Sequence, residues 1–432
     1  MQNSIGKSSL KTVRKKATYF PKVEDVLAAK LTLNNILEST PLQRNRNLSE
    51  RFENNIFLKR EDLQMVRSYK IRGAYNRIKN LSPTQMEKGI ICASAGNHAQ
   101  GVAYSCQMLQ IHGIIYMPST TPRQKVKQVK MFGKESVEVI LTGDTYDDAF
   151  AAAMEECNKN NRTFIHPFDD PKIIEGQATV GLEILEQINK SIDYIFVPIG
   201  GGGLISGVGS YVKQMSPKTK IIGVEPAGAP AMKESLNAGS VVELKDIDKF
   251  VDGAAVRRVG DLCFSIAQKV IDDLVLVPEG KICTKILELY NFDAIVVEPA
   301  GALSIAALDY YAKEIKGKNV ICILSGSNND ITRTEEIKER SLLFEGLKHY
   351  FIIRFPQRSG ALRDFVDKVL GPDDDITHFE YRKKTSREKG PALVGVELQR
   401  PEDFDGMMER MELHGFIAEY LNEQPELFQY LI

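Results

Sequence analysis

The 432-residue sequence contains no tryptophan, and its six cysteines lie far apart, without a CxxC pair. Zinc ribbons need such closely spaced cysteines, and disulfide frameworks are typical of short secreted chains, so we expect reduced, buried thiols. The charges nearly cancel, because 56 basic and 57 acidic side chains leave a net charge of −1. Surfaces that bind nucleic acid or anionic membranes need an excess of basic groups, so the sequence predicts neither partner.

A secretory signal and a long apolar run are also missing. Basic side chains are frequent in the first sixteen residues, but no apolar segment follows them. The stretch from 194 to 212 has no charge, yet Pro198 and six glycines interrupt it, which argues against a membrane span. We therefore expect a cytoplasmic protein with a poorly ordered basic extension over residues 1–24.

From about residue 55 to 330, short apolar runs alternate with helical stretches. Strands are predicted at 90–93, 111–117, 137–141, 194–199, 220–224, 294–297 and 319–324. Helices are predicted at 98–109, 123–131, 146–158 and from 204 to about 214. This alternation is typical of an α/β fold with a parallel sheet covered on both faces, whose ligand binds at the carboxyl ends of the strands.

After about residue 335 the pattern changes. A charged helix at 335–346 is followed by predicted strands at 350–355, 376–382, 392–398 and 416–421, with helices at 361–370 and 402–414. The order βαββαβ is that of a small independent sheet. The sequence therefore divides into an extension (1–24), a large α/β domain (25–335), a linker helix (336–348) and a small domain (349–423).

Four successive glycines, from Gly200 to Gly203, stand before Leu204 between a predicted strand and a predicted helix. Their backbone N–H groups can curl around an anion at the positive end of the helix, which favours a phosphate. The loop is no Walker A motif, because Val208 stands where a lysine is needed. It also resembles a dinucleotide fingerprint that ends at Ser206, with Glu225 about 20 residues further on. A tight glycine turn without ligand is the less favoured alternative.

Three further segments could carry chemistry. Ser94-Ala95-Gly96-Asn97-His98 either caps a helix or forms a cup for a carboxylate. Ser325-Gly326-Ser327-Asn328 offers a neutral hydroxyl, or is an ordinary polar turn. Lys70, in Ser68-Tyr69-Lys70-Ile71-Arg72-Gly73, is either a surface lysine or a desolvated nucleophile.

Together, in this order and spacing, the four segments resemble those of the fold-type II pyridoxal-phosphate enzymes, and the match is closest to the biosynthetic threonine ammonia-lyases. Thr40-Pro41-Leu42 and Glu298-Pro299-Ala300-Gly301-Ala302 also resemble that family. The likeness covers about residues 25–335, and the tail resembles the family's ACT-like regulatory domain. It implies two parallel-sheet α/β subdomains followed by a βαββαβ domain.

The resemblance implies a role for individual residues toward pyridoxal 5′-phosphate. Lys70 would bind it covalently and later act as general base, Asn97 would bond its ring hydroxyl, and Ser325 would face its pyridine nitrogen. Tyr69, where relatives often have phenylalanine, would stack on the ring. The phosphate would be held by Gly200, Gly201, Gly202, Gly203 and Leu204.

The implied reaction is β-elimination of water from L-threonine, which gives 2-oxobutanoate and ammonia for the first step of isoleucine biosynthesis. The substrate would bind at Ser94, Ala95, Gly96 and His98. Ala95 replaces the serine acid of related serine racemases, so racemisation is disfavoured. Those racemases hold a divalent metal through a glutamate and an aspartate six residues apart. Here Ala231 stands six residues after Glu225, in the place of the aspartate, so no such metal site is predicted.

The resemblance also predicts regulation through the small domain. Pro356, Arg358 and Gly360 lie in the loop where ACT-like domains meet an amino acid, here isoleucine as inhibitor and valine opposing it. One such unit per chain would pair between subunits, in a homotetramer or a dimer. A purely structural oligomerisation domain is the alternative. For the whole chain, the alternatives are a serine lyase or racemase, a nicotinamide-dependent dehydrogenase and a silent amino-acid sensor.

Overall fold

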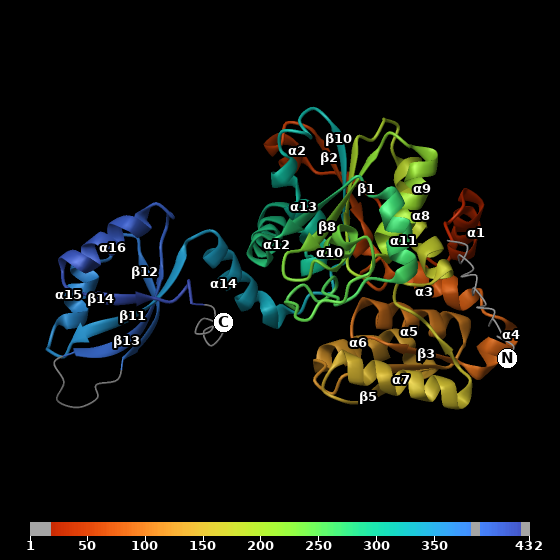
Figure 1. Cartoon of the computed structure of the whole chain (residues 1–432), viewed down its shortest axis with the longest axis horizontal. Helices are drawn as coiled ribbons and strands as arrows, with labels where there is room; N and C mark the ends of the chain where they lie inside the picture. Colours follow the sequence, from red (N-terminus) through yellow and green to blue (C-terminus); the bar gives the residue numbers. More distant parts are fainter. Residues whose placement is uncertain (1–18, 382–388, 425–432) are drawn as a thin grey trace, which may run out of the picture.

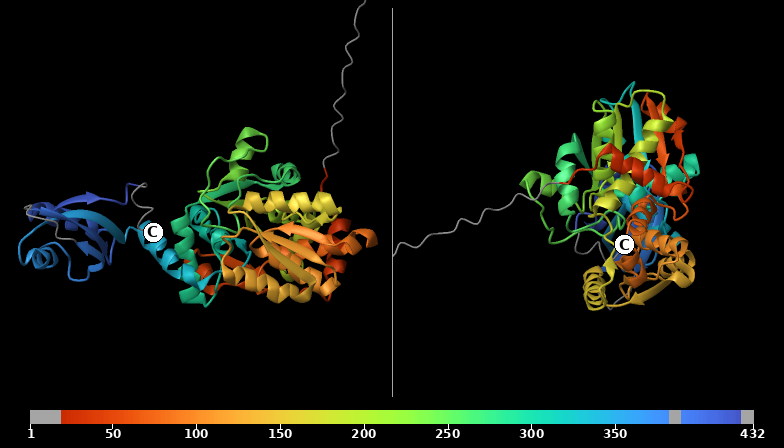
Figure 2. Two further views of the ribbon diagram at one scale, coloured as in Figure 1. Left: turned by 90° about the horizontal axis from the view of Figure 1, so that it is seen from below. Right: turned by 90° about the vertical axis from the view of Figure 1, so that its right-hand side faces the viewer.

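A computed structural model describes residues 19–381 and 389–424. Three β-sheets organise these residues. Two sheets form the two lobes of a large α/β body, and the third lies in a smaller unit that helix α14 (Thr334–Phe344) joins to that body (Figure 1). The views of Figure 2 place the smaller unit at one end of an elongated molecule. In the described part of the chain, no helix has the length and apolarity that crossing a bilayer requires.

The larger lobe contains a six-stranded sheet with the order β1-β2-β10-β7-β8-β9. Its strands are β1 (Leu42–Arg44), β2 (Asn55–Arg60), β7 (Tyr194–Pro198), β8 (Lys220–Pro226), β9 (Asp273–Val277) and β10 (Asn319–Leu324). All neighbours are parallel except β1, which runs antiparallel to β2. The residues of β7 are all buried, which explains its uninterrupted apolar sequence. The helices of this lobe are α1 (Val23–Leu33), α2 (Arg46–Arg51), α8 (Pro171–Gln187), α9 (Gly203–Met215), α10 (Ala231–Ala238), α11 (Asp261–Val270), α12 (Glu279–Asp293) and α13 (Pro299–Ala306).

The smaller lobe is inserted after β2 and contains a parallel four-stranded sheet with the order β5-β4-β3-β6. Its strands are β3 (Ile90–Ala93), β4 (Gly113–Met117), β5 (Val137–Leu141) and β6 (Thr163–Phe164). The helices between β2 and β6 are α3 (Lys70–Lys79), α4 (Pro83–Lys88), α5 (Asn97–Leu109), α6 (Arg123–Gly133) and α7 (Tyr146–Asn160). Side-chain caps start several helices, and Thr145, for example, accepts a 3.2 Å hydrogen bond from the backbone N–H of Asp148 at the start of α7.

A buried ion network fastens α3 to the larger lobe. The Arg72 guanidinium, 1% exposed, donates to both oxygens of Glu61 at 2.8 and 2.7 Å and to both oxygens of Glu183 at 2.6 and 2.8 Å. The Lys59 ammonium on β2 donates to the same Glu183 at 2.6 Å. Charges buried in this way must be paired, so the network fixes the first turn of α3, which begins at Lys70.

The smaller unit contains an antiparallel sheet with the order β12-β13-β11-β14. Its elements in chain order are β11 (Lys348–Pro356), α15 (Ala361–Lys368), β12 (Asp375–Tyr381), β13 (Lys389–Glu397), α16 (Asp403–Leu413) and β14 (Ile417–Tyr420). Phe351, Phe365 and Met407 lie in its separate apolar core. The predicted α/β fold with a βαββαβ unit behind it is therefore confirmed; residues 1–18 of the predicted extension, and residue 382, lie outside the described residues.

The strand predicted at residues 294–297 is wrong. Ala294 ends α12 with a left-handed φ of 53°, and the residues after it form an extended connection to α13. Ile295 and Val297 are buried while Val296 is 52% exposed, so the apolar run marks burial against the core without a strand partner. The strands β1, β2, β6 and β9, which we did not predict individually, complete the two parallel-sheet lobes.

Candidate active site

Lys70 is mostly buried at the start of α3, between the two lobes. Its ε-amine donates to the backbone carbonyl of Pro167 at 3.0 Å and lies 5.5 and 6.0 Å from the ring centroids of Tyr69 and Phe168. Burial lowers the pKa of this amine to about 8, because a charged ammonium is disfavoured away from water. Lys70 therefore has the environment of a nucleophile and not of a surface lysine.

The glycine loop, residues 200–204, connects the end of β7 to the start of α9. Gly202 has a φ of 97°, in the left-handed region that favours glycine. A Cβ on Gly201 would lie 2.3 Å from the Phe168 ring, so the aromatic ring beside Lys70 also packs on this loop. Within residues 19–381 and 389–424, the backbone N–H groups of 200–204 donate no hydrogen bond. Unused donors at a helix N-terminus are suited to a phosphate.

Asn97 begins α5 and has its side-chain amide fixed from both ends. Its Nδ2 donates to Oε1 of Glu298 at 2.6 Å, and its Oδ1 accepts from Nδ2 of Asn328 at 2.6 Å. Glu298 is 5% exposed, and burial, with a smaller effect of nearby Asp252, raises its pKa to about 7. The amide of Asn97 is therefore oriented before any ligand binds.

Ser325 follows the carboxyl end of β10 and lies next to the lysine segment. Its hydroxyl is buried and donates to the Ala300 carbonyl at 3.2 Å, while its own carbonyl accepts from the Tyr69 N–H at 3.2 Å. The structure thus brings the Lys70, Asn97 and Ser325 segments and the glycine loop together at the carboxyl ends of β10, β7 and β3.

The loop after β3 has an open part and a buried part. Ser94 Oγ accepts a 3.3 Å hydrogen bond from the Gly96 N–H, and a Cβ on Gly96 would meet nothing within 4 Å. Ala95 beside them is partly exposed. His98, in contrast, is 3% exposed with Nε2 2.9 Å from the Ile165 carbonyl, and burial lowers its pKa to about 3. The neutral imidazole anchors the loop, and the open part has room for a small ligand.

Phe168 and the carboxylate of Glu298 are site residues that sequence reasoning missed. Phe168 belongs to no motif, and its place between Lys70 and Gly201 arises only from the fold. Glu298 belongs to a motif that carried the family resemblance, but nothing in the sequence connects its carboxylate with Asn97.

These residues fit pyridoxal phosphate. A desolvated amine can bind its aldehyde, and the N–H groups of the glycine loop can receive its phosphate. The fixed amide of Asn97 and the neutral hydroxyl of Ser325 offer polar contacts to a ring between them. Four features of one site therefore match four parts of one cofactor.

Glu225 does not behave as the acidic partner of a dinucleotide. It is 1% exposed, and its two oxygens accept from the N–H groups of Met232 and Lys233 at 2.7 and 2.9 Å, which caps α10. Since the carboxylate is buried against the start of α10, ribose hydroxyls could not reach it in this structure. Among the described residues, no three His, Cys, Asp or Glu side chains are grouped to hold a metal ion.

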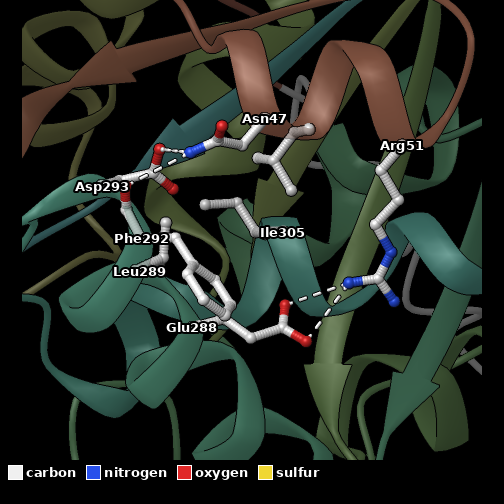
Figure 3. Close-up of a pocket in the computed structure, with 8 residues that line it drawn as sticks. Asn47, Arg51, Glu288, Leu289, Phe292, Asp293 and Ile305 are labelled. Atoms are coloured by element: carbon white, nitrogen blue, oxygen red, sulfur yellow. Dashed lines mark hydrogen bonds and ion pairs between the residues drawn. The ribbon is translucent and has the colours of Figure 1, made fainter.

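Two cavities lie away from this site. One, of about 140 Å³, lies between α2, α12 and α13 and is bounded by the Arg51–Glu288 and Asn47–Asp293 contacts (Figure 3). None of the predicted site residues lines it. The other, of about 210 Å³, lies in the small unit between β11, β12 and the start of α15, and its lining includes Pro356, Arg358 and Gly360. The three predicted effector-loop residues thus share one cavity.

Two family models match the chain. Residues 33–326 match the model described as "Pyridoxal-phosphate dependent enzyme". Residues 339–431 match the model described as "C-terminal regulatory domain of Threonine dehydratase".

Close relatives have the same length and organisation. A biosynthetic L-threonine dehydratase of Halalkalibacterium halodurans is 62% identical over 95% of this chain and 99% of its own. The corresponding enzyme of Bacillus subtilis is 59% identical over 95% of this chain and 97% of its own.

Solved structures resemble the two-lobed body. The processed form of threonine deaminase isoform 2 from Solanum lycopersicum superimposes with a TM-score of 0.70 at 41% identity, over 76% of this chain and 96% of that one. Maize serine racemase also gives a TM-score of 0.70, at 30% identity, over 75% of this chain and 98% of that one.

Proposed function

The chain belongs to the pyridoxal-phosphate-dependent enzyme family and ends in the regulatory domain of threonine dehydratases, and from this premise we propose that it deaminates L-threonine to 2-oxobutanoate and ammonia. The observation that carries the proposal is the near-full-length identity of 62% to a biosynthetic threonine dehydratase, together with the desolvated Lys70 amine beside the glycine loop. The product is the precursor that isoleucine biosynthesis requires.

Lys70 does two things in this reaction. Its amine would hold the cofactor, and when free it would remove the proton from Cα of the substrate. A pKa of about 8 leaves a substantial fraction of the amine neutral near pH 7.5, as both tasks require. The contact with the Pro167 carbonyl keeps the amine in the site between these steps.

The remaining polar groups hold the cofactor in place. Pyridoxal phosphate, when bound, withdraws electrons from Cα and makes its proton acidic. The N–H groups of residues 200–204 and the positive end of α9 would hold its phosphate, and Asn97 its ring hydroxyl. The hydroxyl of Ser325, which donates to the Ala300 carbonyl here, would face the ring nitrogen, and a neutral partner would not favour ring protonation as a carboxylate would.

The substrate carboxylate would bind at the open part of the loop after β3, where Ser94 and the backbone around Gly96 lie. Ala95 offers no hydroxyl, so this position would supply no acid to return a proton to Cα from the face opposite Lys70. Loss of the β-hydroxyl is then favoured over racemisation. Serine, which lacks the β-methyl group, would be a poorer substrate.

Regulation is proposed for the domain that follows α14. The cavity lined by Pro356, Arg358 and Gly360 combines a cation with apolar walls from Phe355 and Leu362. A guanidinium pairs with a carboxylate, and apolar walls receive a branched aliphatic side chain, so the cavity fits an amino acid such as isoleucine or valine. The resemblance to the threonine ammonia-lyases implies that isoleucine would inhibit and that valine would oppose it.

The oligomeric state, the compartment and the domain limits complete the proposal. One βαββαβ unit per chain, with edge strands β12 and β14, would pair with its copy in a homotetramer or dimer. The enzyme would act in the cytoplasm. The catalytic domain would span residues 25–335, the linker helix 336–348 and the regulatory domain 349–423.

A substrate panel tests the proposed reaction. The purified protein would be incubated separately with L-threonine, L-serine and D-serine, and the 2-oxo acid and ammonia released would be measured over time. The two products should form in equal amounts. We expect the highest kcat/KM with L-threonine and no interconversion of the serine enantiomers. A preference for serine, or racemisation without ammonia release, would identify a different member of the family.

A further inference from the structure

The 248–254 segment, which connects α10 and α11, lies between the linker helix and the active site. Phe250 is 4% exposed, and the guanidinium carbons of Arg333 and Arg340 lie 4.7 and 4.4 Å from its ring centroid. Arg333 also donates to the Phe250 carbonyl at 2.9 Å, and Arg340 lies 3.6 Å from the Asp248 carboxylate. The carboxylate of Glu336 bridges both guanidinium groups, with contacts of 3.4 Å to Arg333 and 3.0 Å to Arg340.

The same helix contacts the regulatory domain one residue before Arg340. The Tyr350 hydroxyl on β11 donates to Glu339 at 2.6 Å, and the mostly buried Lys348 ammonium lies 3.6 Å from the same carboxylate. Helix α14 has 11 residues, and Glu339 and Arg340 are neighbours on it. Glu339 therefore connects β11 to the helix that carries Arg340.

The other end of the 248–254 segment touches the groups that would hold the cofactor. A Cβ on Gly200 of the glycine loop would lie 3.0 Å from Cα of Ala254. A Cβ on Gly253 would lie 3.4 Å from Oε1 of Glu298, the oxygen that accepts from Asn97. The segment is thus in direct packing contact with the glycine loop and with the carboxylate that orients Asn97.

Asp252, in the middle of the segment, adds a contact to the smaller lobe. Its carboxylate lies 2.5 Å from the Lys125 ammonium on α6 and 3.8 Å from the Arg333 guanidinium. Exposed ion pairs of this kind contribute little stability. The Asp252 carboxylate nevertheless contacts both α6 of the smaller lobe and Arg333, the residue before α14. The start of α14 is therefore connected to both lobes through this segment.

We propose that the 248–254 segment positions the glycine loop and Asn97 for the cofactor, and that the regulatory domain acts on catalysis by moving this segment through Arg333 and Arg340. The regulatory half of this inference rests on the proposed inhibition by isoleucine. Its physical basis is that packed elements shift between discrete arrangements, so that a small displacement of α14 reaches the site through contiguous contacts. Phe250, Arg333 and Arg340 are positioning residues, since none of them touches the reacting atoms.

The test uses three full-length variants. Phe250→Leu keeps an apolar side chain but removes the ring that both guanidinium groups contact. Arg340→Gln is the milder change, because the Arg340 side chain is 28% exposed. Lys220→Gln is the matched control, because it also removes a cation–aromatic contact, of 5.5 Å to Tyr194. Lys220 begins β8 and therefore lies away from the carboxyl ends of the strands, where the site is. Three quantities would be measured: the pyridoxal phosphate dissociation constant of the apo-protein, isoleucine binding by calorimetry and the maximal inhibition at saturating isoleucine.

We expect cofactor affinity to fall about fivefold in Phe250→Leu and Arg340→Gln and to stay unchanged in Lys220→Gln. Isoleucine should bind all three variants as it binds the wild type, while the maximal inhibition at saturating isoleucine falls by about half in the first two. Unchanged cofactor affinity in both variants, or unchanged maximal inhibition with intact isoleucine binding, would overturn the inference. If the wild type bound no isoleucine, the proposed regulation would fail, and the regulatory half of the inference with it. The cofactor affinities would still decide whether the segment positions the site.

Discussion

The side-chain amide of Asn97 donates a 2.6 Å hydrogen bond to the buried carboxylate of Glu298, 201 residues away in the sequence. Asn97 begins α5 of the smaller lobe, and Glu298 precedes α13 of the larger lobe, so the bond joins the two lobes across the site. With Asn328 holding the amide oxygen, the free N–H of Asn97 has a single direction left for a ligand. The pair therefore sets the geometry on one side of the cofactor.

Glu298→Gln should remove a pH dependence of stability. The carboxyl has a pKa of about 7 when folded, against 4.5 ordinarily, so between these values the folded chain holds a proton that the unfolded chain has released. Stability from this group is therefore lost as the pH rises through that window. We expect the thermal midpoint of the apo-variant minus that of the apo-wild type, measured by circular dichroism, to increase from about pH 4.5 to about pH 7. Glu50→Gln on exposed α2 is the control, and a pH-independent difference for Glu298→Gln would contradict the assignment.

The rate at which the apo-protein binds pyridoxal phosphate covalently should follow the ionisation of Lys70. Only the neutral amine attacks an aldehyde, and burial lowers its pKa to about 8. We expect the rate to rise about tenfold per pH unit below pH 8 and to level off above it, whereas an ordinary lysine would continue to rise toward about pH 10.4. Stopped-flow absorbance measures this rate, with the free ε-amine of Nα-acetyl-lysine as the reference. A plateau only above pH 10 would show that Lys70 is not desolvated.

Gly201→Ala should weaken cofactor binding while the fold survives. The new methyl group would lie 2.3 Å from a ring carbon of Phe168, so either the ring or the glycine loop must move. A cost of about 1–3 kcal/mol for overpacking corresponds to a loss of roughly tenfold to a hundredfold in affinity. Equilibrium titration of the apo-protein gives the dissociation constant. Gly406→Ala on α16, where the nearest atom is the flexible end of Arg410 at 3.3 Å, should bind as wild type does.

Arg358→Ala should relieve inhibition by isoleucine without changing turnover in its absence. Arg358 is one of two arginines that line the cavity of the small domain, with Arg363, and it also pairs with Asp364. Losing a charge-assisted bond of about 1.5–3 kcal/mol should raise the inhibition midpoint by roughly tenfold to a hundredfold, read from initial rates. A matched change, Arg400→Ala, removes a guanidinium that pairs with Asp403 and does not line the cavity, and should leave inhibition intact.

A chain ending at Phe344 extends this test, because it keeps α14 and lacks the whole small domain. It should retain turnover and lose the response to isoleucine. Persisting inhibition by isoleucine in this chain would place the effector site in the catalytic domain instead.

The sequence predicted well the parts of the molecule that depend on local pattern. Strand β7 and the part of β10 from Val320 onward are buried and have continuous apolar runs, and the loops that follow them carry the glycines and Ser325. The same reasoning failed at residues 294–297, because burial without a partner strand produces the same apolar pattern as a strand. The edge strand β1, with only three residues, carries too short a pattern to be recognised.

The contacts within the site could not be predicted, since they depend on which segments the fold brings together. Phe168 lies beside both Lys70 and Gly201 only because the chain between β6 and α8 crosses the site there. The buried ion network of Arg72 likewise joins residues from β2, α3 and α8, of which the sequence shows only scattered charges. The order of the motifs in the sequence identified the loops of the site. Which residues pack against these loops depends on the tertiary structure.

The visible absorption spectrum of the purified protein, recorded before and after L-threonine is added, tests the central claim most directly. We expect a yellow chromophore that changes on addition of threonine, with 2-oxo acid appearing at the same time, and we expect Lys70→Ala to fold but to lack the chromophore and turnover. A wild-type protein that stays colourless after incubation with pyridoxal phosphate, or a Lys70→Ala variant that still deaminates threonine, would contradict the account.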